Sequence, residues 1–258
     1  MHELRSERID VSGRETIVLT AGVGEPLVFL HGGGIVEGFE CFLPLAERFR
    51  FIAPQMPGFG GTALRPALSG IDDLTAHNDG VLDALGVETA VLVGHSLGGW
   101  AAASFAAAHP ERVRRLVVAA PFGLDVPEHP LANVAAMSYD ELFATLTGDP
   151  SVFAGRLPAG PDPEFDAARA LEGRSLAGFV PGPFDPALAA KLASLEVPTM
   201  VQWGDDDRIV PVGHLPAWEA ALTQRPQVRV YAGVGHLLFH EHAPAVADIA
   251  AFAGGAGP

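Results

Sequence analysis

Short runs of apolar residues alternate along this chain with segments in which apolar positions recur every three or four residues. The runs predict buried strands at 26–30, 51–53, 91–93, 113–119, 199–203 and 228–231. The wider spacing predicts helices at 43–48, 72–85, 100–108 and 244–252. Continuously apolar strands separated by helices are typical of a mainly parallel sheet with helices on both faces. The predicted fold class is therefore α/β.

Two departures from this alternation suggest how the chain is organised. Residues 5–11 and 15–20 read as extended segments around Ser12-Gly13-Arg14, which predicts a hairpin at the start. Proline and glycine are frequent between residues 122 and 195, yet helical spacing persists at 137–146 and 164–171. We expect a core made of residues 1–121 and 196–258, and a small helical cap, or lid, at 122–195.

Composition narrows the classes of function. The chain has 258 residues, 48% of them hydrophobic, and a formal net charge of -15. This suits a globular enzyme acting on a small molecule and disfavours nucleic acid or an anionic membrane as partner. Cys41 has no second cysteine to pair with, and the first residues lack a signal-peptide pattern, so a soluble, cytoplasmic monomer or homodimer is expected.

Residues 90–108 contain a predicted strand, then a serine with a glycine two positions to either side, and then a predicted helix. A nucleophile elbow requires these three features in this order. Such an elbow turns so sharply that side chains two residues to either side of the nucleophile would clash. Gly94 and Gly98 occupy those two positions around Ser96. Ser96 is therefore a candidate nucleophile, placed at a helix N-terminus that favours negative charge on a reacting oxygen.

A serine nucleophile needs a histidine to take its proton and a carboxylate to orient that histidine. In chains with an elbow these partners follow in the order acid, then histidine, each after a later strand. The strand at 199–203 runs into Gly204-Asp205-Asp206-Asp207, and the strand at 228–231 runs into Gly233-Val234-Gly235-His236. Both partners are thus available in the required order.

At these residues the chain resembles the α/β-hydrolase family, in particular its small bacterial esterases and meta-cleavage-product hydrolases. The resemblance rests on His31-Gly32-Gly33-Gly34, Pro57-Gly58-Phe59-Gly60, Gly94-His95-Ser96-Leu97-Gly98-Gly99, Trp203-Gly204-Asp205-Asp206-Asp207 and Gly235-His236. It implies a catalytic triad of Ser96 as nucleophile, His236 as general base and then acid, and Asp207 as orienting carboxylate. It also implies an oxyanion hole formed by the backbone N–H groups of Leu97 and Gly33.

Two alternatives compete with this assignment. Asp206 is the fallback for Asp207, because a shift of one residue on a loop is compatible with the spacing. His240, Glu241 and His242 could suggest a metal cluster, but they lie in or beside the start of the last predicted helix without further supporting ligands. We expect no metal and no cofactor, and we expect structural roles for His31 and His95.

Substrate choice is expected to depend on the cap and the site rim. The candidate pocket residues are Gly34, His95, Phe122, Met137, Tyr139, Phe143 and Leu237. The aromatic and aliphatic residues of the cap favour a largely apolar carboxylic ester or lactone of small to medium size, cleaved through an acyl-enzyme on Ser96. The alternatives are carbon–carbon bond hydrolysis of a dienoic diketo acid, with Arg156, Arg169 or Arg174 binding its carboxylate, and a non-catalytic receptor for a small molecule.

Overall fold

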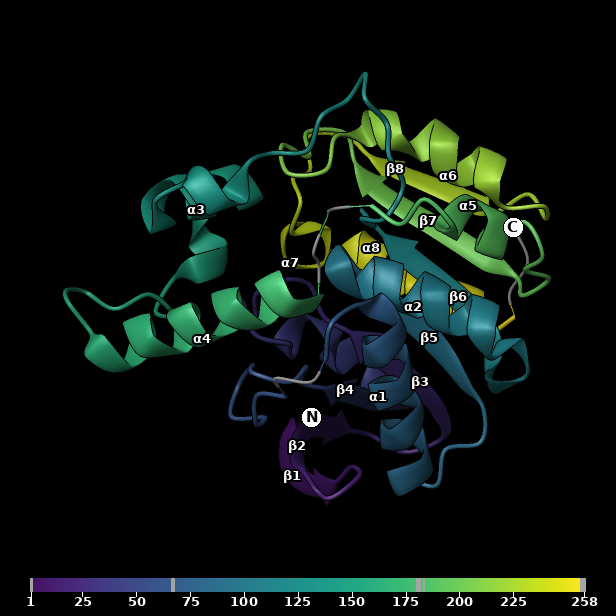
Figure 1. Cartoon of the computed structure of the whole chain (residues 1–258), viewed down its shortest axis with the longest axis horizontal. Helices are drawn as coiled ribbons and strands as arrows, with labels where there is room; N and C mark the ends of the chain where they lie inside the picture. The colour runs from purple at the N-terminus through teal and green to yellow at the C-terminus, as the bar shows by residue number, and fades with distance from the viewer. Residues whose placement is uncertain (1, 66–67, 180–181, 183, 256–258) are drawn as a thin grey trace.

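A single mixed sheet lies at the centre of the computed structural model (Figure 1). Within the described residues, 2–65, 68–179, 182 and 184–255, it has eight strands in the order β1-β2-β4-β3-β5-β6-β7-β8. Pairing is antiparallel for β1 with β2 and β2 with β4, and parallel elsewhere. The strands are β1 (Arg5–Asp10), β2 (Glu15–Ala21), β3 (Glu25–Leu30), β4 (Phe49–Pro54), β5 (Ala90–His95), β6 (Val113–Ala119), β7 (Thr199–Gly204) and β8 (Gln227–Tyr231).

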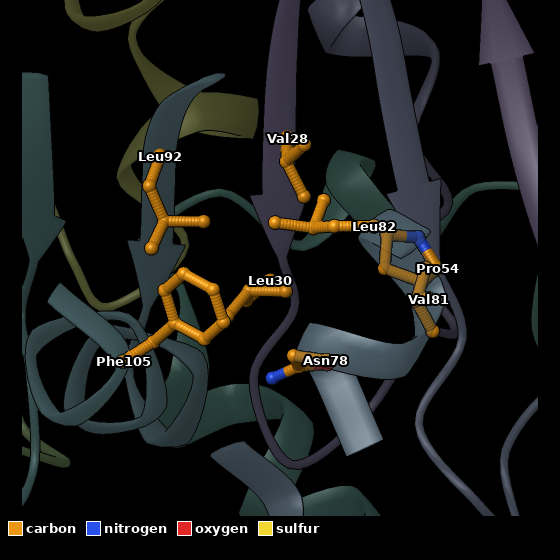
Figure 2. A pocket seen from close by; sticks show the side chains of 8 residues that line it. All are labelled: Val28, Leu30, Pro54, Asn78, Val81, Leu82, Leu92 and Phe105. Carbon is orange, nitrogen blue, oxygen red and sulfur yellow. The ribbon is translucent and has the colours of Figure 1, made fainter. Parts of the chain in front are cut away.

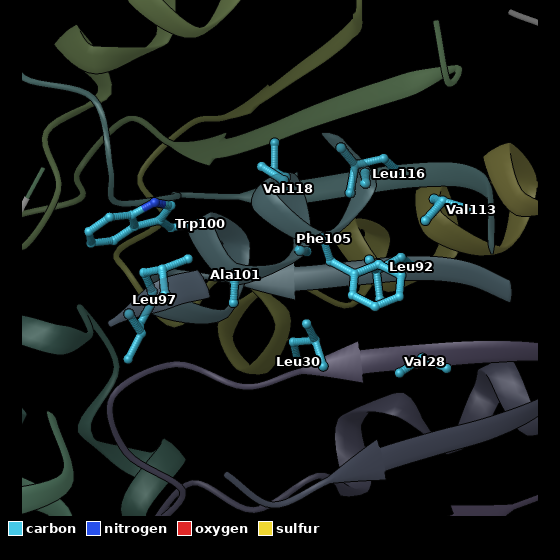
Figure 3. Close-up of a cluster of buried hydrophobic side chains, with 14 of the residues drawn as sticks. Val28, Leu30, Leu92, Leu97, Trp100, Ala101, Phe105, Val113, Leu116 and Val118 are labelled. Carbon is cyan, nitrogen blue, oxygen red and sulfur yellow. The ribbon is translucent and has the colours of Figure 1, made fainter. Parts of the chain in front are cut away.

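Helices cover both faces of the sheet, as the continuously apolar strands require. One face packs against α1 (Ile71–Ala84), α2 (Leu97–Ala108), α5 (Leu188–Leu192) and α6 (Leu215–Ala221). Figure 3 shows Trp100, Ala101 and Phe105 of α2 beside the side chains of the central strands on this face, with which they form one cluster. The other face packs against the 3-10 helix η1 (Glu40–Glu47), α7 (Leu238–Glu241) and α8 (Ala243–Ala253). Alternate strand residues therefore enter separate cores, as Val28 and Leu27 do.

The predicted cap contains α3 (Tyr139–Leu146), α4 (Pro163–Phe179) and the 3-10 helices η3 (Val134–Ala136) and η4 (Pro150–Phe153). Figure 1 shows α3 and α4 set apart from the helices that cover the sheet. Ser138 and Glu141 form a capping box that starts α3, and Asp162 accepts hydrogen bonds from the first N–H groups of α4. The limits 122–195 remain a prediction, since α5 falls inside them and packs into the core.

Three segments differ from the elements predicted from sequence. The helix expected at 43–48 is η1, a 3-10 helix, and Pro44 inside it cannot donate an α-helical hydrogen bond. The helix expected at 164–171 continues to Phe179 through Gly173. Helix α6 was not predicted, because it is short and carries proline in its first turn. No helix within the described residues is both long enough and apolar enough to cross a membrane.

A small cavity lies inside the core between α1, α2 and the sheet (Figure 2). Its volume is about 10 Å³, and its lining is Val28, Leu30, Pro54, Asn78, Val81, Leu82, Leu92 and Phe105. A space of this size holds no more than one water molecule. It includes none of the predicted triad residues, so it is not a candidate for a substrate site.

Candidate active site

The nucleophile elbow predicted from sequence is present between β5 and α2. Ser96 has φ 56° and ψ -120°, a strained conformation for a residue with a side chain. A Cβ on Gly94 would collide with the carbonyl oxygen of Gly98, and one on Gly98 with that of Leu30. Glycine is therefore required at both positions, and the hydroxyl of Ser96 is presented at the first turn of α2.

Three side chains from separate loops are joined by hydrogen bonds at this elbow. Ser96 Oγ lies 3.0 Å from Nε2 of His236, and His236 Nδ1 lies 2.8 Å from Oδ2 of Asp207. All three residues are at least 95% buried. The geometry is that of a serine hydroxyl, a proton-accepting imidazole and a carboxylate that fixes the tautomer of the imidazole.

The structure distinguishes between the three consecutive aspartates after β7. The second carboxylate oxygen of Asp207 accepts hydrogen bonds from the N–H groups of Ile209 and Val210, both at 2.9 Å. Asp205 instead accepts a hydrogen bond from the backbone of Gly233, and the side chain of Asp206 is 57% exposed. Only the first of these arrangements orients a carboxylate toward His236 within the described loop.

Two further histidines hold the loops around the triad. His95 donates from Nε2 to the carbonyl oxygen of His236 at 2.8 Å, and burial lowers the pKa of His95 well below its ordinary value. His31 donates from Nδ1 to the Gly32 carbonyl and accepts from the Met56 N–H. Burial lowers the pKa of His31 to about 4. Both rings are therefore neutral and engaged with backbone groups.

The predicted oxyanion-hole residues lie beside the elbow. Leu97 is the first residue of α2, where backbone N–H groups have no intrahelical partner. Among the described residues, the N–H groups of Leu97 and Gly33 donate no hydrogen bond within the chain. A Cβ on Gly33 would stand 3.3 Å from the side chain of Leu176 in α4, so the cap helix reaches this loop.

The candidate pocket residues divide into two groups. Phe122 donates its N–H to the Ser96 carbonyl at 3.2 Å, Leu237 is adjacent to His236, and Gly34 has open space at its Cβ position. Tyr139, which is 43% exposed, stacks on Phe143 instead.

Phe143 in turn contacts Phe153, with ring centroids 4.6 Å apart. Phe143 and Phe153 therefore pack against each other within the predicted cap, while Tyr139 lies at its exposed edge. Met137 is half-buried.

Charged side chains on the inner face of α4 were missed as a group by the sequence analysis. Arg169 donates to Glu172 at 2.7 Å, and their side chains are 14% and 5% exposed. Leu176, which covers Gly33, lies on the same helical face, one turn further on. The signal in the sequence was the three-residue spacing of the two charges.

Glu37, on the loop after the three glycines, faces the same charges. Its side chain is partly accessible to water, yet burial by surrounding protein raises the pKa of Glu37 to about 7 against the opposing charges of His236 and Arg169. Burial also raises the pKa of Glu172 to about 7, with Arg169 opposing and Glu37 adding to the shift. Two carboxyls and one guanidinium thus lie near the triad.

The three arginines considered from sequence are in different environments. Arg156 pairs with Glu40 at 2.8 Å and is 34% exposed, while Arg174 lies on the exposed side of α4. Arg169 is the least exposed of the three and points to the face that carries Leu176.

The three residues considered as a metal cluster have separate partners. His240 contacts the Gly38 carbonyl at 3.1 Å, Glu241 accepts from the Gly148 N–H at 3.0 Å, and His242 stacks on Tyr231. They do not converge on a common point. Within the described residues, no group of three or more potential ligands comes together.

Comparison with known proteins gives consistent matches over most of the chain. The model of the Alpha/beta hydrolase family matches residues 27–249. The 2-hydroxymuconate semialdehyde hydrolase of Pseudomonas sp. (strain CF600) is 33% identical, covering 93% of this chain and 90% of that protein. The 2-hydroxy-6-oxo-6-phenylhexa-2,4-dienoate hydrolase of Burkholderia cepacia is 30% identical, covering 87% and 86%. A solved structure of an enzyme of that name from Rhodococcus sp. strain RHA1 has a TM-score of 0.81 at 22% identity, covering 98% and 99%.

Proposed function

The chain belongs to the alpha/beta hydrolase family and is a hydrolase, and from this premise we propose that it cleaves a carbon–carbon bond in a dienoic diketo acid formed by aromatic meta-cleavage. The observation that carries this proposal is the identity of at least 30%, over nearly the whole chain, to two hydrolases named for such substrates. Ester or lactone cleavage, which the sequence favoured, becomes the second candidate. A receptor without catalysis has no support from an intact hydrogen-bonded triad.

The triad geometry supports a nucleophilic route. Ser96 Oγ adds to the ketone carbonyl carbon while His236 takes its proton, and the N–H groups of Gly33 and Leu97 stabilise the resulting oxyanion. Asp207 stabilises the imidazolium of His236. With the substrate in its keto form, the carbon–carbon bond next to the carbonyl then breaks, its electron pair passes through the adjacent double bond to the 2-oxo oxygen, and this enolate oxygen receives the proton from His236.

The second half of the reaction regenerates the enzyme. An acyl group remains on Ser96, and a water molecule activated by His236 attacks its carbonyl carbon. Collapse of this second tetrahedral intermediate releases a carboxylic acid and returns the proton to Ser96 Oγ. The sum is substrate plus water giving a carboxylic acid and a hydroxydienoate, with no change in oxidation state overall.

Arg169 is the best-placed group for a substrate carboxylate. It lies on the α4 face that reaches Gly33, and its Nε is buried without a hydrogen-bond partner among the described residues. Charge-assisted hydrogen bonds of this type contribute about 1.5–3 kcal/mol, which corresponds to roughly 10- to 100-fold in affinity.

A specific observation keeps ester hydrolysis as the second candidate. Glu172 already occupies one end of the Arg169 guanidinium, and Glu37 adds a further carboxyl near the triad. Several partly buried apolar side chains pack against the same core as α2, among them Ile35, Phe122, Leu142, Leu146 and Leu176. An uncharged apolar ester would fit such surroundings without a change in protonation.

The deciding experiment compares substrates on one enzyme preparation. Wild type and Ser96→Ala would be assayed with 2-hydroxymuconate semialdehyde, 2-hydroxy-6-oxo-6-phenylhexa-2,4-dienoate, p-nitrophenyl butyrate and a δ-lactone. We expect kcat/KM for a dienoate to exceed that for the esters by at least roughly tenfold, and Ser96→Ala to abolish turnover. Cleavage of esters with no loss of dienoate absorbance would refute the carbon–carbon assignment.

Variants on α4 test the carboxylate site separately. Arg169→Gln should raise KM for the dienoate roughly tenfold or more and leave KM for p-nitrophenyl butyrate within about twofold. Arg174→Gln, on the exposed side of the same helix, is the matched control. An effect of Arg174→Gln that equals or exceeds that of Arg169→Gln would place the anion site elsewhere.

A further inference from the structure

Glu241 connects two segments that are far apart in sequence, and the reaction described above does not use it. Its Oε2 accepts a hydrogen bond from the Gly148 N–H at 3.0 Å and one from the Gly235 N–H at 3.4 Å. Gly235 directly precedes His236. Gly148 belongs to residues 146–149, the last residue of α3 and the chain from it to η4, which we call the strap.

The strap makes further contacts with both triad loops. The Leu237 N–H donates to the Leu146 carbonyl at 3.1 Å, so the residues on both sides of His236 are bound to the strap or to Glu241. Arg208, next to Asp207 in sequence, donates to the Thr147 carbonyl at 3.2 Å. Thr147 itself is 2% exposed. The strap is therefore part of the packed structure around the histidine loop.

The packing at this point leaves little room for adjustment. A Cβ on Gly235 would lie 2.9 Å from Glu241 Oε1, 3.2 Å from Thr147 Cα and 3.3 Å from Gly148 N. Oε1 of Glu241 is buried and has no hydrogen-bond partner among the described residues. Burying a carboxylate oxygen in this way is unfavourable, so the two hydrogen bonds to Oε2 must offset that penalty.

The histidine loop is also held from the opposite side. His95 donates to the carbonyl oxygen of His236 at 2.8 Å, and the two rings lie 4.7 Å apart. Glu241 and the strap thus supply one side of a clamp, and His95 supplies the other. Without Glu241, the N–H groups of Gly235 and Gly148 would lose their shared acceptor, while the hydrogen bonds from His95 to His236 and from Leu237 to Leu146 would remain.

We propose that Glu241 is a positioning residue, which couples the strap of the cap to the placement of the His236 imidazole over Ser96. The proposal rests on the Ser96–His236 pair carrying out hydrolysis as set out under the proposed function. It holds for either substrate class. A misplacement of about 1 Å in such a pair can reduce the rate on the order of a hundredfold.

The experiment measures the reactivity of Ser96 without choosing a substrate. The second-order rate constant for labelling by a fluorophosphonate would be determined for wild type, Glu241→Ala, Glu241→Gln and Glu196→Ala across the range of about pH 6 to 9. Glu196 is an exposed residue outside the site and serves as the matched control. Hydrogen exchange of peptides covering 146–149 and 235–241 would be followed on the same proteins, together with urea unfolding.

We expect Glu241→Ala to lower the labelling rate per folded molecule roughly tenfold to a hundredfold. Exchange should increase in both peptides. Glu241→Gln keeps an oxygen acceptor, so its rate should recover to within about threefold of wild type, with the midpoint of the pH profile unchanged. Glu196→Ala should match wild type.

Three results would overturn the proposal. The first is a normal labelling rate in Glu241→Ala, even with lower stability, which would indicate a structural role only. The second is a Gln variant as slow as the Ala variant with a displaced pH midpoint, which would indicate action through charge. The third is faster exchange confined to one peptide. Absence of labelling in wild type would instead contradict the assignment of Ser96 as nucleophile.

Discussion

The buried carboxyl of Glu172 leads to a quantitative prediction for Glu172→Gln. Its side chain is 5% exposed, and burial raises the pKa of Glu172 from its ordinary value of 4.5 to about 7. The folded protein therefore holds this proton more tightly than the unfolded chain does. Stability from this group is fully present below about pH 4.5 and is lost as the pH rises through about 7.

The size of the effect follows from the two pKa values. Well above about pH 7, ionisation of this buried carboxyl lowers the free energy of unfolding by about 3 kcal/mol, which we call the penalty. Each tenfold difference in proton affinity between the folded and the unfolded chain corresponds to about 1.4 kcal/mol. Between about pH 5.5 and pH 8 the penalty grows by about 2 kcal/mol. Glutamine cannot ionise, so this loss is absent from Glu172→Gln. The free energy of unfolding of the variant minus that of wild type should therefore be about 2 kcal/mol larger at about pH 8 than at about pH 5.5.

Urea unfolding followed by tryptophan fluorescence measures this difference, because Trp203 and Trp218 are fully buried. The lower pH stays above the isoelectric point of about 4.9, where association would interfere. Glu164→Gln, exposed near the start of the same helix, is the control and should show no pH-dependent difference. A gap between Glu172→Gln and wild type that changes by less than about 0.5 kcal/mol would refute the reasoning.

Two further predictions concern the elbow and the aspartate loop. Asp207→Asn should lower kcat by about 10⁴-fold, because the imidazole loses its orienting carboxylate, while Asp206→Asn should keep it within about twofold; equal losses in both would contradict the hydrogen-bond assignment. Gly98→Ala places a Cβ against the backbone of Leu30, so the free energy of unfolding should fall by about 3 kcal/mol or more. Gly34→Ala meets open space and should change it by less than about 0.5 kcal/mol, and a comparable loss in both variants would argue against the packing described.

The central strands β3 to β7 were predictable because each contains a short apolar run that is buried in the structure, whereas β1 is polar and exposed and was predicted only from the turn beside it. The predicted strand 113–119 coincides with β6, and the family assignment and α/β fold are confirmed. The end of α4 was not predictable, because Gly173 has a low intrinsic helix propensity. Leu176, near that end, packs over Gly33, a contact between residues far apart in sequence.

The order of an elbow serine, an aspartate loop and a histidine, each after a strand, indicated where the triad would lie, and the family resemblance assigned the roles to Ser96, Asp207 and His236, which the structure joins by hydrogen bonds. Spacing could not separate Asp206 from Asp207, because that choice depends on which carboxylate receives the two backbone N–H groups after it. The raised pKa values of Glu37 and Glu172 could not be predicted from the sequence for another reason. They result from burial, and the burial of Glu172 on α4 depends on how the cap packs over the core.

These charges bear on which substrate class the site accepts. When Glu37 and Glu172 are ionised, their two negative charges exceed the single positive charge of Arg169. An approaching substrate carboxylate is then repelled by the net negative charge. Protonation of both, near pH 7, leaves the guanidinium free to pair with the substrate. A neutral ester gains nothing from that change. We therefore predict that the ratio of kcat/KM for an anionic dienoate to kcat/KM for an ester is greatest on the acid side of about pH 7, and this ratio across pH reports on these charges more directly than either activity at one pH.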